Sequence, residues 1–319
     1  MKLAAFYRAV IAAGMAADPR PRKHIQNELV RRKKAFADLD EADRQYHDKD
    51  CLFNPYSDTR VLFGADTTEI GRVMVGIDID AGELAVADGL RQKGEKIDLV
   101  LAHHPSGRAL AGLHDVMRMQ VDILHSLGVP ISAAEGMMEG RVKEIERRLL
   151  PANHNRAGDA ARLLDLPLMC AHTPADNLVS LHLQNRFAKE KPYRLGDVLE
   201  MLMAEPEYQD GARSGIRPRI LLGGKERRAG NIMLEMTGGT SGAKEAFAQI
   251  ASRGVDTIVG MHISDDYRKE AKKHHLNVVI AGHISSDNLG MNLLLDEVMA
   301  KAGAIEIVAV SGFRRCLRS

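Results

Sequence analysis

The sequence predicts an α/β fold. From about residue 58 onwards, short apolar runs of strand length alternate with amphipathic segments of helix length, the pattern of parallel strands joined by helices. Several of these apolar runs end directly in histidine or aspartate, at the strand ends where open α/β sheets bind ligands. The 319 residues are 45% hydrophobic and 27% charged, which is typical of a globular protein with one large or two smaller domains.

The first 57 residues predict helices. Arg8 interrupts the apolar centre that a secretory signal would need, so an amphipathic helix is the better interpretation of the N-terminus. The basic run 20–34 and the acidic run 38–50 are interpreted as solvated helix faces, in preference to an RNA-binding patch. The apolar residues at helical spacing are Leu3, Phe6, Tyr7, Val10 and Ile11.

The remaining elements follow in order along the chain. Residues 72–80 predict a strand and 81–94 a helix. Residues 97–102 predict a buried strand, because the run is short and apolar and follows a polar stretch. Further helices are expected at 113–128, 141–150, 240–254, 265–275 and 288–303, and further strands before residue 172 and at 217–224, 230–239, 255–262, 276–283 and 304–313. No internal repeat with a clean period is evident.

Composition excludes several classes of function. A net charge of +1, 4% aromatic residues and no tryptophan disfavour a nucleic-acid partner. The three cysteines, Cys51, Cys170 and Cys316, are far apart, which indicates free thiols in a reducing compartment. No apolar run approaches the roughly 18 residues of a membrane span. We therefore expect a cytoplasmic protein with no membrane partner.

Histidines end four of the apolar runs, and two of them precede an aspartate by four positions, which places each pair on one face of a helix. Repeated nitrogen and carboxylate donors at strand ends are typical of an open, catalytic-type metal site, and the absence of cysteine disfavours a closed structural zinc site. One histidine pair alone would more often cap backbone or face solvent. The residues are His103 and His104, His172 with Asp176, His262, and His283 with Asp287.

Three motifs, LVLAHHPSG, AHTPAD and VVIAGHISSD, occur in that order and resemble the signatures of the NIF-three-like family. These are dinuclear-metal proteins also described as type 2 GTP-cyclohydrolase-I-like. The resemblance covers roughly residues 60–110 and 165–310, and three motifs together are specific. It implies a three-layer α/β/α architecture with two lobes, a metal cleft between or beside them and a helical N-terminal extension. It also implies a homo-oligomer, often a ring-shaped hexamer.

The resemblance implies a site that binds two divalent metal ions (Zn, Fe or Mn), with Asp176 as the bridging ligand. His172 is then a candidate catalytic residue, for orientation of a ligand or proton transfer. His262 stands where the family usually has an acidic residue, and it is either a candidate catalytic residue near the substrate or a surface histidine. Asp287 stands where the family usually has glutamate, and Asp78 is expected to orient a ligand histidine or to lie beside a helix cap. The implied metal ligands are His103, His104, Asp176, His283 and Asp287.

We expect three parts of the chain. Residues 1–57 form the helical extension. Residues 58–180 with 283–319 form the first α/β lobe, with an insertion at about 114–160 that lids or reshapes the cleft. Residues 181–282 form the second α/β lobe.

The predicted function is metal-dependent hydrolysis of a small-molecule phosphoester or nucleotide-like substrate. The alternative is a non-catalytic metal-binding scaffold or a metal-handling regulatory protein, which would need the same ligands. A DHH-type phosphoesterase is disfavoured, because the further aspartate motifs it requires are missing. The glycine-rich segment 236–244 is interpreted as an ordinary tight turn before a helix rather than a phosphate loop, since it lacks the Walker spacing.

Overall fold

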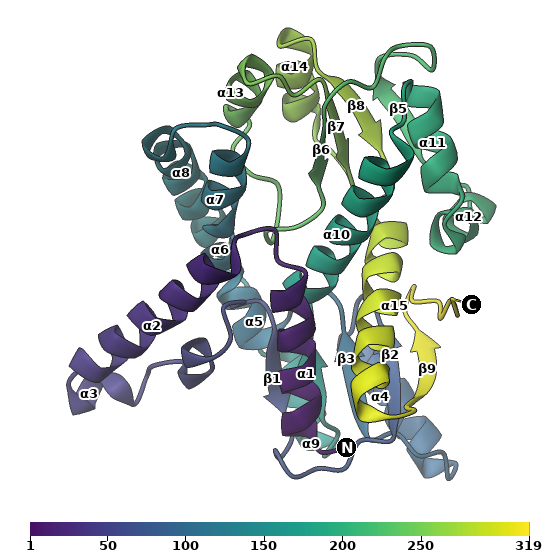
Figure 1. The fold of residues 1–319 in the computed structure, drawn as a ribbon. Coiled ribbons are helices and arrows are strands. Elements are labelled where there is room, and N and C mark those ends of the chain that lie inside the picture. The colour runs from purple at the N-terminus through teal and green to yellow at the C-terminus, as the bar shows by residue number, and fades with distance from the viewer. Residues whose placement is uncertain (319) are drawn as a thin grey trace.

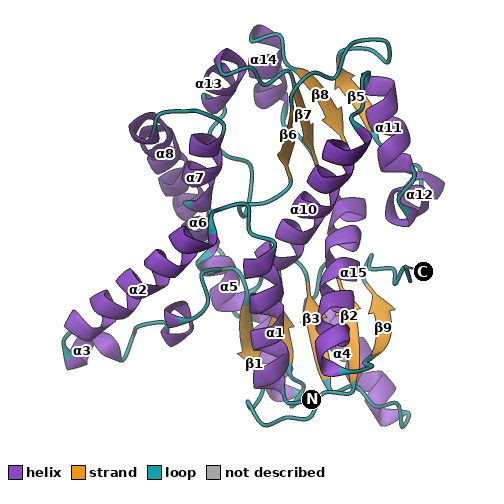
Figure 2. Ribbon diagram, in the orientation of Figure 1, coloured by secondary structure: helices purple, strands orange, loops and turns teal. Residues whose placement is uncertain are grey.

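The computed structural model describes residues 1–318 and builds two lobes, each around its own sheet (Figure 1, Figure 2). The strand order is β1-β4-β3-β2-β9 in the first sheet and β5-β8-β7-β6 in the second. The predicted α/β class is confirmed. The strands are β1 (Arg60–Phe63), β2 (Arg72–Gly76), β3 (Leu99–Ala102), β4 (Leu168–Cys170), β5 (Arg219–Leu222), β6 (Ile232–Glu235), β7 (Thr257–Gly260), β8 (Asn277–Ile280) and β9 (Glu306–Val310).

Helices surround the two sheets and connect them. No helix within residues 1–318 is long and apolar enough to cross a membrane. The helices are α1 (Leu3–Ala16), α2 (Arg22–Asp38), α3 (Glu41–Arg44), the short η1 (Lys49–Leu52), α4 (Ala81–Gln92), α5 (Gly107–Ala111), α6 (Leu113–Val116), α7 (Met119–Ser126), α8 (Ile131–Leu149), α9 (Arg156–Leu163), α10 (Thr173–Glu190), α11 (Leu195–Met203), α12 (Pro206–Arg213), α13 (Ala246–Ser252), α14 (Asp265–Lys273) and α15 (His283–Ala302).

The two sheets share one topology. In each, three strands run parallel, and an outer strand joins them antiparallel: β1 beside β4, and β5 beside β8. Each outer strand also shifts register at the same place, between Val61 and Phe63 in β1 and between Ile220 and Leu222 in β5. The first sheet has one additional strand, β9, which pairs parallel with β2. The chain therefore contains an internal repeat: the order and direction of four strands are the same in both sheets.

The repeat extends to the helices that leave the sheets. Strand β4 leads into α10 and β8 into α15, and both junctions carry the pattern His-x-x-x-Asp-Asn-Leu, at residues 172–178 and 283–289. The sequence shows no clean period, and the repeat becomes visible only in the order and direction of the strands. The shared residues are confined to such short motifs, and the segments between them differ in length.

Helix α1 belongs to the core of the first lobe. Its apolar face is buried against β2 and the C-terminal helix α15, where Phe6 and Val10 join a cluster with Val73 and Leu294. The amphipathic helix predicted from apolar spacing is thus confirmed. Helix α2, which carries the basic run, buries only Ile25, as expected for a solvated helix face.

The short helix α7 and the long helix α8 pack against the second lobe. Met138 and Val142 of α8 share a buried cluster with Phe247 and Ile250 of α13. This packing joins much of the segment 114–160, expected as an insertion in the first lobe, to the core of the second. The domain limits themselves stay a prediction.

Helix α10 packs against both α1 and α15, which also contact each other, and it approaches both closely. A Cβ atom on Gly290 of α15 would lie 2.5 Å from the backbone oxygen of Ala175, and one on Gly14 of α1 would lie 2.7 Å from the Cβ of Pro174. Real Cβ atoms do not approach other atoms this closely, so only glycine permits these contacts. The two glycines therefore set how close the first turn of α10 comes to its neighbours.

Gly290→Ala is expected to lower the free energy of unfolding by about 1–3 kcal/mol, because the added methyl group must push α10 and α15 apart. Thermal or denaturant unfolding measures this loss. The matched control is Gly140→Ala in α8, where an added Cβ meets nothing within 4 Å. It should instead raise stability by about 0.5–1 kcal/mol, because alanine is the better helix former. Equal effects of the two changes would contradict the close approach.

Candidate metal centre

His103 follows β3 and is fully buried. Its backbone N–H donates to Gly76 O at 2.9 Å, which extends the pairing with β2 beyond the strand. Its Nδ1 lies 3.2 Å from the carbonyl oxygen of Ala171, and because a carbonyl can only accept, Nδ1 carries the proton. The lone pair is then on Nε2, which has no hydrogen-bond partner among the described residues. A buried, unpartnered Nε2 is the state in which histidine binds metals.

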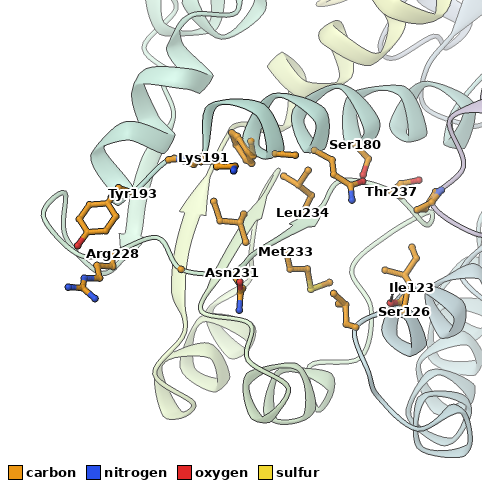
Figure 3. A pocket seen from close by; sticks show the side chains of 18 residues that line it. Ile123, Ser126, Ser180, Lys191, Tyr193, Arg228, Asn231, Met233, Leu234 and Thr237 are labelled. Atoms are coloured by element: carbon orange, nitrogen blue, oxygen red, sulfur yellow. Dashed lines mark hydrogen bonds between the residues drawn. The ribbon is translucent and has the colours of Figure 1, made fainter.

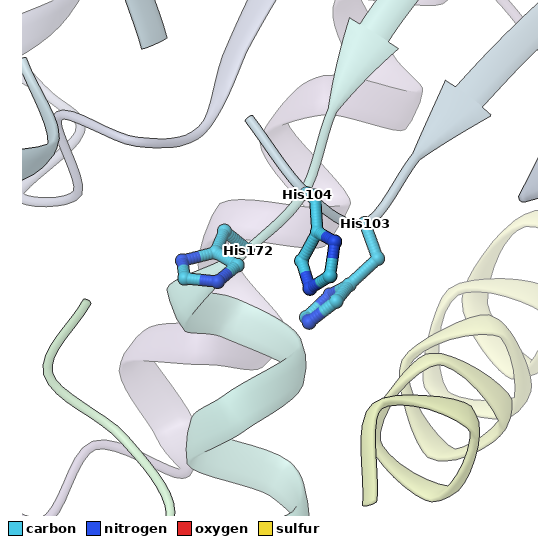
Figure 4. A group of neighbouring side chains, drawn as sticks. All are labelled: His103, His104 and His172. Carbon is cyan, nitrogen blue, oxygen red and sulfur yellow. The ribbon is translucent and has the colours of Figure 1, made fainter. Parts of the chain in front are cut away.

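His104 and His172 are held in the same way. Nδ1 of His104 lies 2.7 Å from the carboxylate of Asp78. Asp78 therefore orients this histidine, which is the first of the two roles expected for it. Nδ1 of His172 lies 2.9 Å from the buried carboxylate of Asp58. Both rings lie beside that of His103, whose centroid is 5.2 Å from His104 and 4.9 Å from His172 (Figure 4).

Two carboxylates from near the starts of α10 and α15 meet these histidines. Asp176 Oδ1 lies 3.6 Å and Asp287 Oδ1 lies 3.5 Å from Nε2 of His103. The other oxygen of Asp287 lies 3.4 Å from Nε2 of His104 and 3.5 Å from Nε2 of His283. Asp287 is 1% exposed, and neither of its oxygens has a hydrogen-bond partner among residues 1–318. Although shorter than the usual glutamate, its side chain reaches the centre of the cluster.

The structure thus brings together all seven residues singled out in the sequence. The ring of His262, which follows β7, lies 4.8 Å from that of His283. Three groups have ligand atoms within 4.8 Å of one another, and their His and Asp side chains could hold a metal ion: His103, His104 and His172; His104, His283 and Asp287; and His103, Asp176 and Asp287. Which of these residues ligate a metal and which take part in catalysis stays a prediction.

No family model matches the sequence, and neither does any curated protein. Solved structures do match. A NIF3 superfamily protein from Sphaerobacter thermophilus is 27% identical, with a TM-score of 0.68 over 81% of this chain and 92% of that one. The chain belongs to the NIF3 superfamily.

Two further matches are more distant. Reduced HcgD from Methanocaldococcus jannaschii is 14% identical, with a TM-score of 0.43 over 84% of this chain and 94% of that one. A Bacillus cereus protein related to NIF3 is 12% identical, with a TM-score of 0.43 over 82% and 92%. The membership of this chain in the NIF3 superfamily rests on the Sphaerobacter structure together with the three motifs.

Burial opposes ionisation of both carboxylates of this NIF3 superfamily site, and the neighbouring histidines offset it to different degrees. Burial raises the pKa of Asp176 to about 6, against the lowering effect of His172 and His103. Burial also opposes ionisation of Asp287, but His103 and His104 hold the pKa of Asp287 below its usual value. Asp287 is therefore the carboxylate that stays ionised, surrounded by histidine nitrogens.

The pKa values of two histidines of the site also shift in opposite directions. Burial lowers the pKa of His172, yet the carboxylates of Asp176 and Asp58 outweigh it and raise this pKa to about 9. Burial lowers the pKa of His283 to about 4, against the effect of Asp287. Without metal, His172 therefore holds a proton while His283 is neutral, so a metal that binds His172 must release a proton.

The second lobe forms the opposite wall of the cleft, whose volume is about 300 Å³. Glu235, at the end of β6, faces this cavity together with His262 and part of the glycine-rich segment 236–244. The carboxylate of Glu235 accepts a hydrogen bond from the backbone N–H of Gly242, and burial raises the pKa of Glu235 to about 7. A carboxylate of the chain itself thus lies inside the glycine-rich turn, which agrees with a tight turn rather than a phosphate loop.

Side chains from three helices tie the glycine-rich turn in place. Gln120 of α7 donates to the backbone oxygens of Gly238 and Thr240, both at 2.7 Å. Arg141 of α8 donates to the backbone oxygen of Ser241 at 3.0 Å, and Tyr267 of α14 donates to that of Gly242 at 2.5 Å. Helices α7, α8 and α14 thus hold the turn that lines this side of the cleft.

Sequence reasoning missed two residues of the site. Asp58 lies in the loop before β1, far from His172 in sequence, and no local pattern connects them. Glu235 ends a strand as the predicted ligands do, but it is followed by a glycine-rich turn rather than by a second donor. The position of Glu235 at a strand end was the one feature of the sequence that could have indicated a role in the site.

Glu235→Gln is expected to change the pH dependence of stability. Burial raises the pKa of Glu235 from 4.5 to about 7, so the folded chain holds this proton more tightly than the unfolded chain. Stability therefore falls as pH rises through this interval, and the uncharged glutamine avoids that loss. Relative to wild type, the variant should gain about 1 kcal/mol more at pH ~8 than at pH ~5, a value reduced for the partial exposure of this side chain.

Denaturant unfolding at the two pH values measures the effect. Glu245→Gln, in the same loop but exposed, serves as the control and should show no such difference. A pH-independent effect of Glu235→Gln would mean that the carboxyl group does not titrate in this range.

Proposed function

We propose that this chain holds two divalent metal ions in the cleft and hydrolyses a phosphoester or nucleotide-like small molecule there. The observation that carries the proposal is the buried, unpartnered donor set formed by Nε2 of His103 and both oxygens of Asp287. Burying such groups without partners costs free energy, and a bound cation would provide the missing partner. The nitrogen and carboxylate donors suit zinc, iron or manganese.

Two overlapping groups of ligands support two ions rather than one. His104, His283 and Asp287 form one group, and His103, Asp176 and Asp287 form the other. Asp287 belongs to both, so the geometry favours Asp287 over the expected Asp176 as the bridge. Each ion would then have three protein ligands, which leaves positions open for water or substrate.

Ions held in this way would lower the pKa of water and polarise a phosphoryl group, as in other two-metal hydrolases. The chain itself supplies proton donors on both sides of the cleft. His172 is oriented by Asp58 and lies close to the donor set, where it would transfer a proton. Glu235, on the opposite wall, has a pKa of about 7, which suits a group that protonates a leaving oxygen near neutral pH.

The cleft is of a size for a small molecule, and both lobes contribute to its lining. Among the described residues that line it there is no lysine or arginine. The negative charge of a phosphoryl group would therefore be balanced by the ions. Assembly into a homo-oligomer, a hexamer by the family resemblance, is part of the same proposal.

Metal content should follow the two ligand groups. Wild-type protein purified without chelator should hold about two ions per chain, and Asp176→Asn about one, because the group with His104 and His283 is intact. Asp287→Asn should hold neither ion tightly, because both groups lose a ligand. Elemental analysis with matched protein concentrations measures this. One ion in the wild type, or two in Asp287→Asn, would contradict the shared carboxylate.

A metal-loaded screen of phosphomonoesters, phosphodiesters and nucleotides tests catalysis. Turnover should require added metal and should fall on the order of 100-fold or more in His103→Ala, which removes a ligand. His24→Ala, on the exposed surface of α2, is the matched control and should keep full activity. Stoichiometric metal binding with no turnover of any substrate would instead identify a metal-binding scaffold.

A further inference from the structure

The outer edge of the second sheet lacks a strand that the first sheet has. Strand β2 of the first lobe pairs with β9 on its outer side. Its counterpart in the second lobe is β6, and β6 pairs only with β7 among the described residues. All four residues of β6 are partly exposed, whereas those of β7 are buried. The repeat therefore leaves one strand position open beside β6.

The direction of the backbone groups on β6 can be derived from its pairing. The N–H of Thr257 donates to the carbonyl of Asn231 at 3.2 Å. Because backbone groups alternate sides along a parallel strand, Ile232 and Leu234 turn their N–H and C=O groups towards the open edge. Unpaired edge groups of this kind are templates for another strand.

The first lobe shows how that position is filled. Strand β9 runs parallel to β2, and the N–H of Glu306 donates to the carbonyl of Gly71 at 2.9 Å. The carboxylate of Glu306 also lies 3.0 Å from Nε of Arg72, at the start of β2. An acidic residue at the beginning of the added strand thus meets a cation at the beginning of the strand it joins.

A groove of about 590 Å³ follows the open edge of β6 (Figure 3). Ile232, Met233 and Leu234 line it from β6, with helices α10 and α7 as the other walls. Phe187 of α10 and Ile123 of α7 add apolar surface. The groove therefore offers backbone donors and acceptors along one side and apolar contacts along the others, as strand-binding grooves do.

Two cations lie at the end of the groove nearest the start of β6, where the carboxylate of Asp256 accepts a hydrogen bond from the backbone N–H of Asn231 at 2.8 Å. Lys191 and Arg228 lie there and are exposed, and neither forms an ion pair within residues 1–318. The residues described as lining the groove include no aspartate or glutamate. This is the end at which Glu306 meets Arg72 in the first lobe, so the charge favours an acidic residue at the same place.

We propose that this groove binds an extended segment of a partner protein, which adds to β6 as a parallel strand and places an acidic residue beside Lys191 and Arg228. The segment would have the chemistry of β9, an acidic residue followed by small and β-branched apolar residues. This binding is separate from the proposed hydrolysis, since it requires neither metal nor turnover.

The probe is a peptide with the sequence of residues 304–311, AIEIVAVS, with an N-terminal fluorophore and two added C-terminal lysines for solubility. Fluorescence anisotropy with the full chain measures its binding. One peptide form carries an N-methyl group at the position of Val308, whose N–H would face β6, and should not bind. Another carries it at the position of Ile307, whose N–H would face away, and should bind as the parent does.

The charge is tested on the protein. Lys191→Glu with Arg228→Glu should weaken binding about tenfold or more, because both changes repel the acidic residue of the peptide. Lys189→Glu with Arg227→Glu makes the same change in charge at exposed residues that do not line the groove. This control should bind within about twofold of wild type.

Several results would overturn the proposal. One is no saturable binding up to about 1 mM peptide, which corresponds to an affinity too weak for a built site. Others are equal binding of the two N-methylated peptides, or equal loss in the two double variants. A change of oligomeric state in Lys191→Glu with Arg228→Glu, measured by light scattering, would mean that a second copy of the chain fills the groove.

Discussion

The structure depends on two carboxylates that are buried together where two helices meet. Asp176 lies in the first turn of α10 and Asp287 is the fifth residue of α15, and both are almost without contact with solvent. Two buried negative charges repel each other and lose their hydration, so they require positive charge close by. The histidines after β3 and the start of α10 supply part of it, and a bound cation would supply the rest.

This requirement explains the close packing around α10. The carboxylates meet the same histidine nitrogens only if α10 and α15 approach each other, and Gly290 permits that approach. Gly14 permits the same close approach between α1 and α10. The N-terminal helix therefore helps to hold the first turn of α10, which carries Asp176, in place. Outer residues such as Asp58 and Asp78 then fix the orientation of the imidazole rings.

The internal repeat organises both halves of the cleft and also shows where they differ. The His-x-x-x-Asp pattern follows one strand of each sheet, β4 and β8, so each sheet leads into a helix that begins with one histidine and one aspartate of the cleft. The second lobe adds Glu235, which has no partner in the ligand cluster. It also lacks the strand that would cover β6, because the one C-terminal strand of the described chain, β9, pairs with β2 in the first sheet.

The sequence by itself determined the α/β class, helix α1 and the donors that meet in the cleft, because each depends on local periodicity or on the ends of short apolar runs. Only the tertiary structure decided the central position of Asp287, the hydrogen bond from His172 to Asp58, and the attachment of α7 and α8 to the second lobe. These depend on contacts between residues far apart in the chain, which no local pattern records. The common topology of the two sheets likewise appears only in strand order, since pairing, unlike periodicity, is a property of the folded chain.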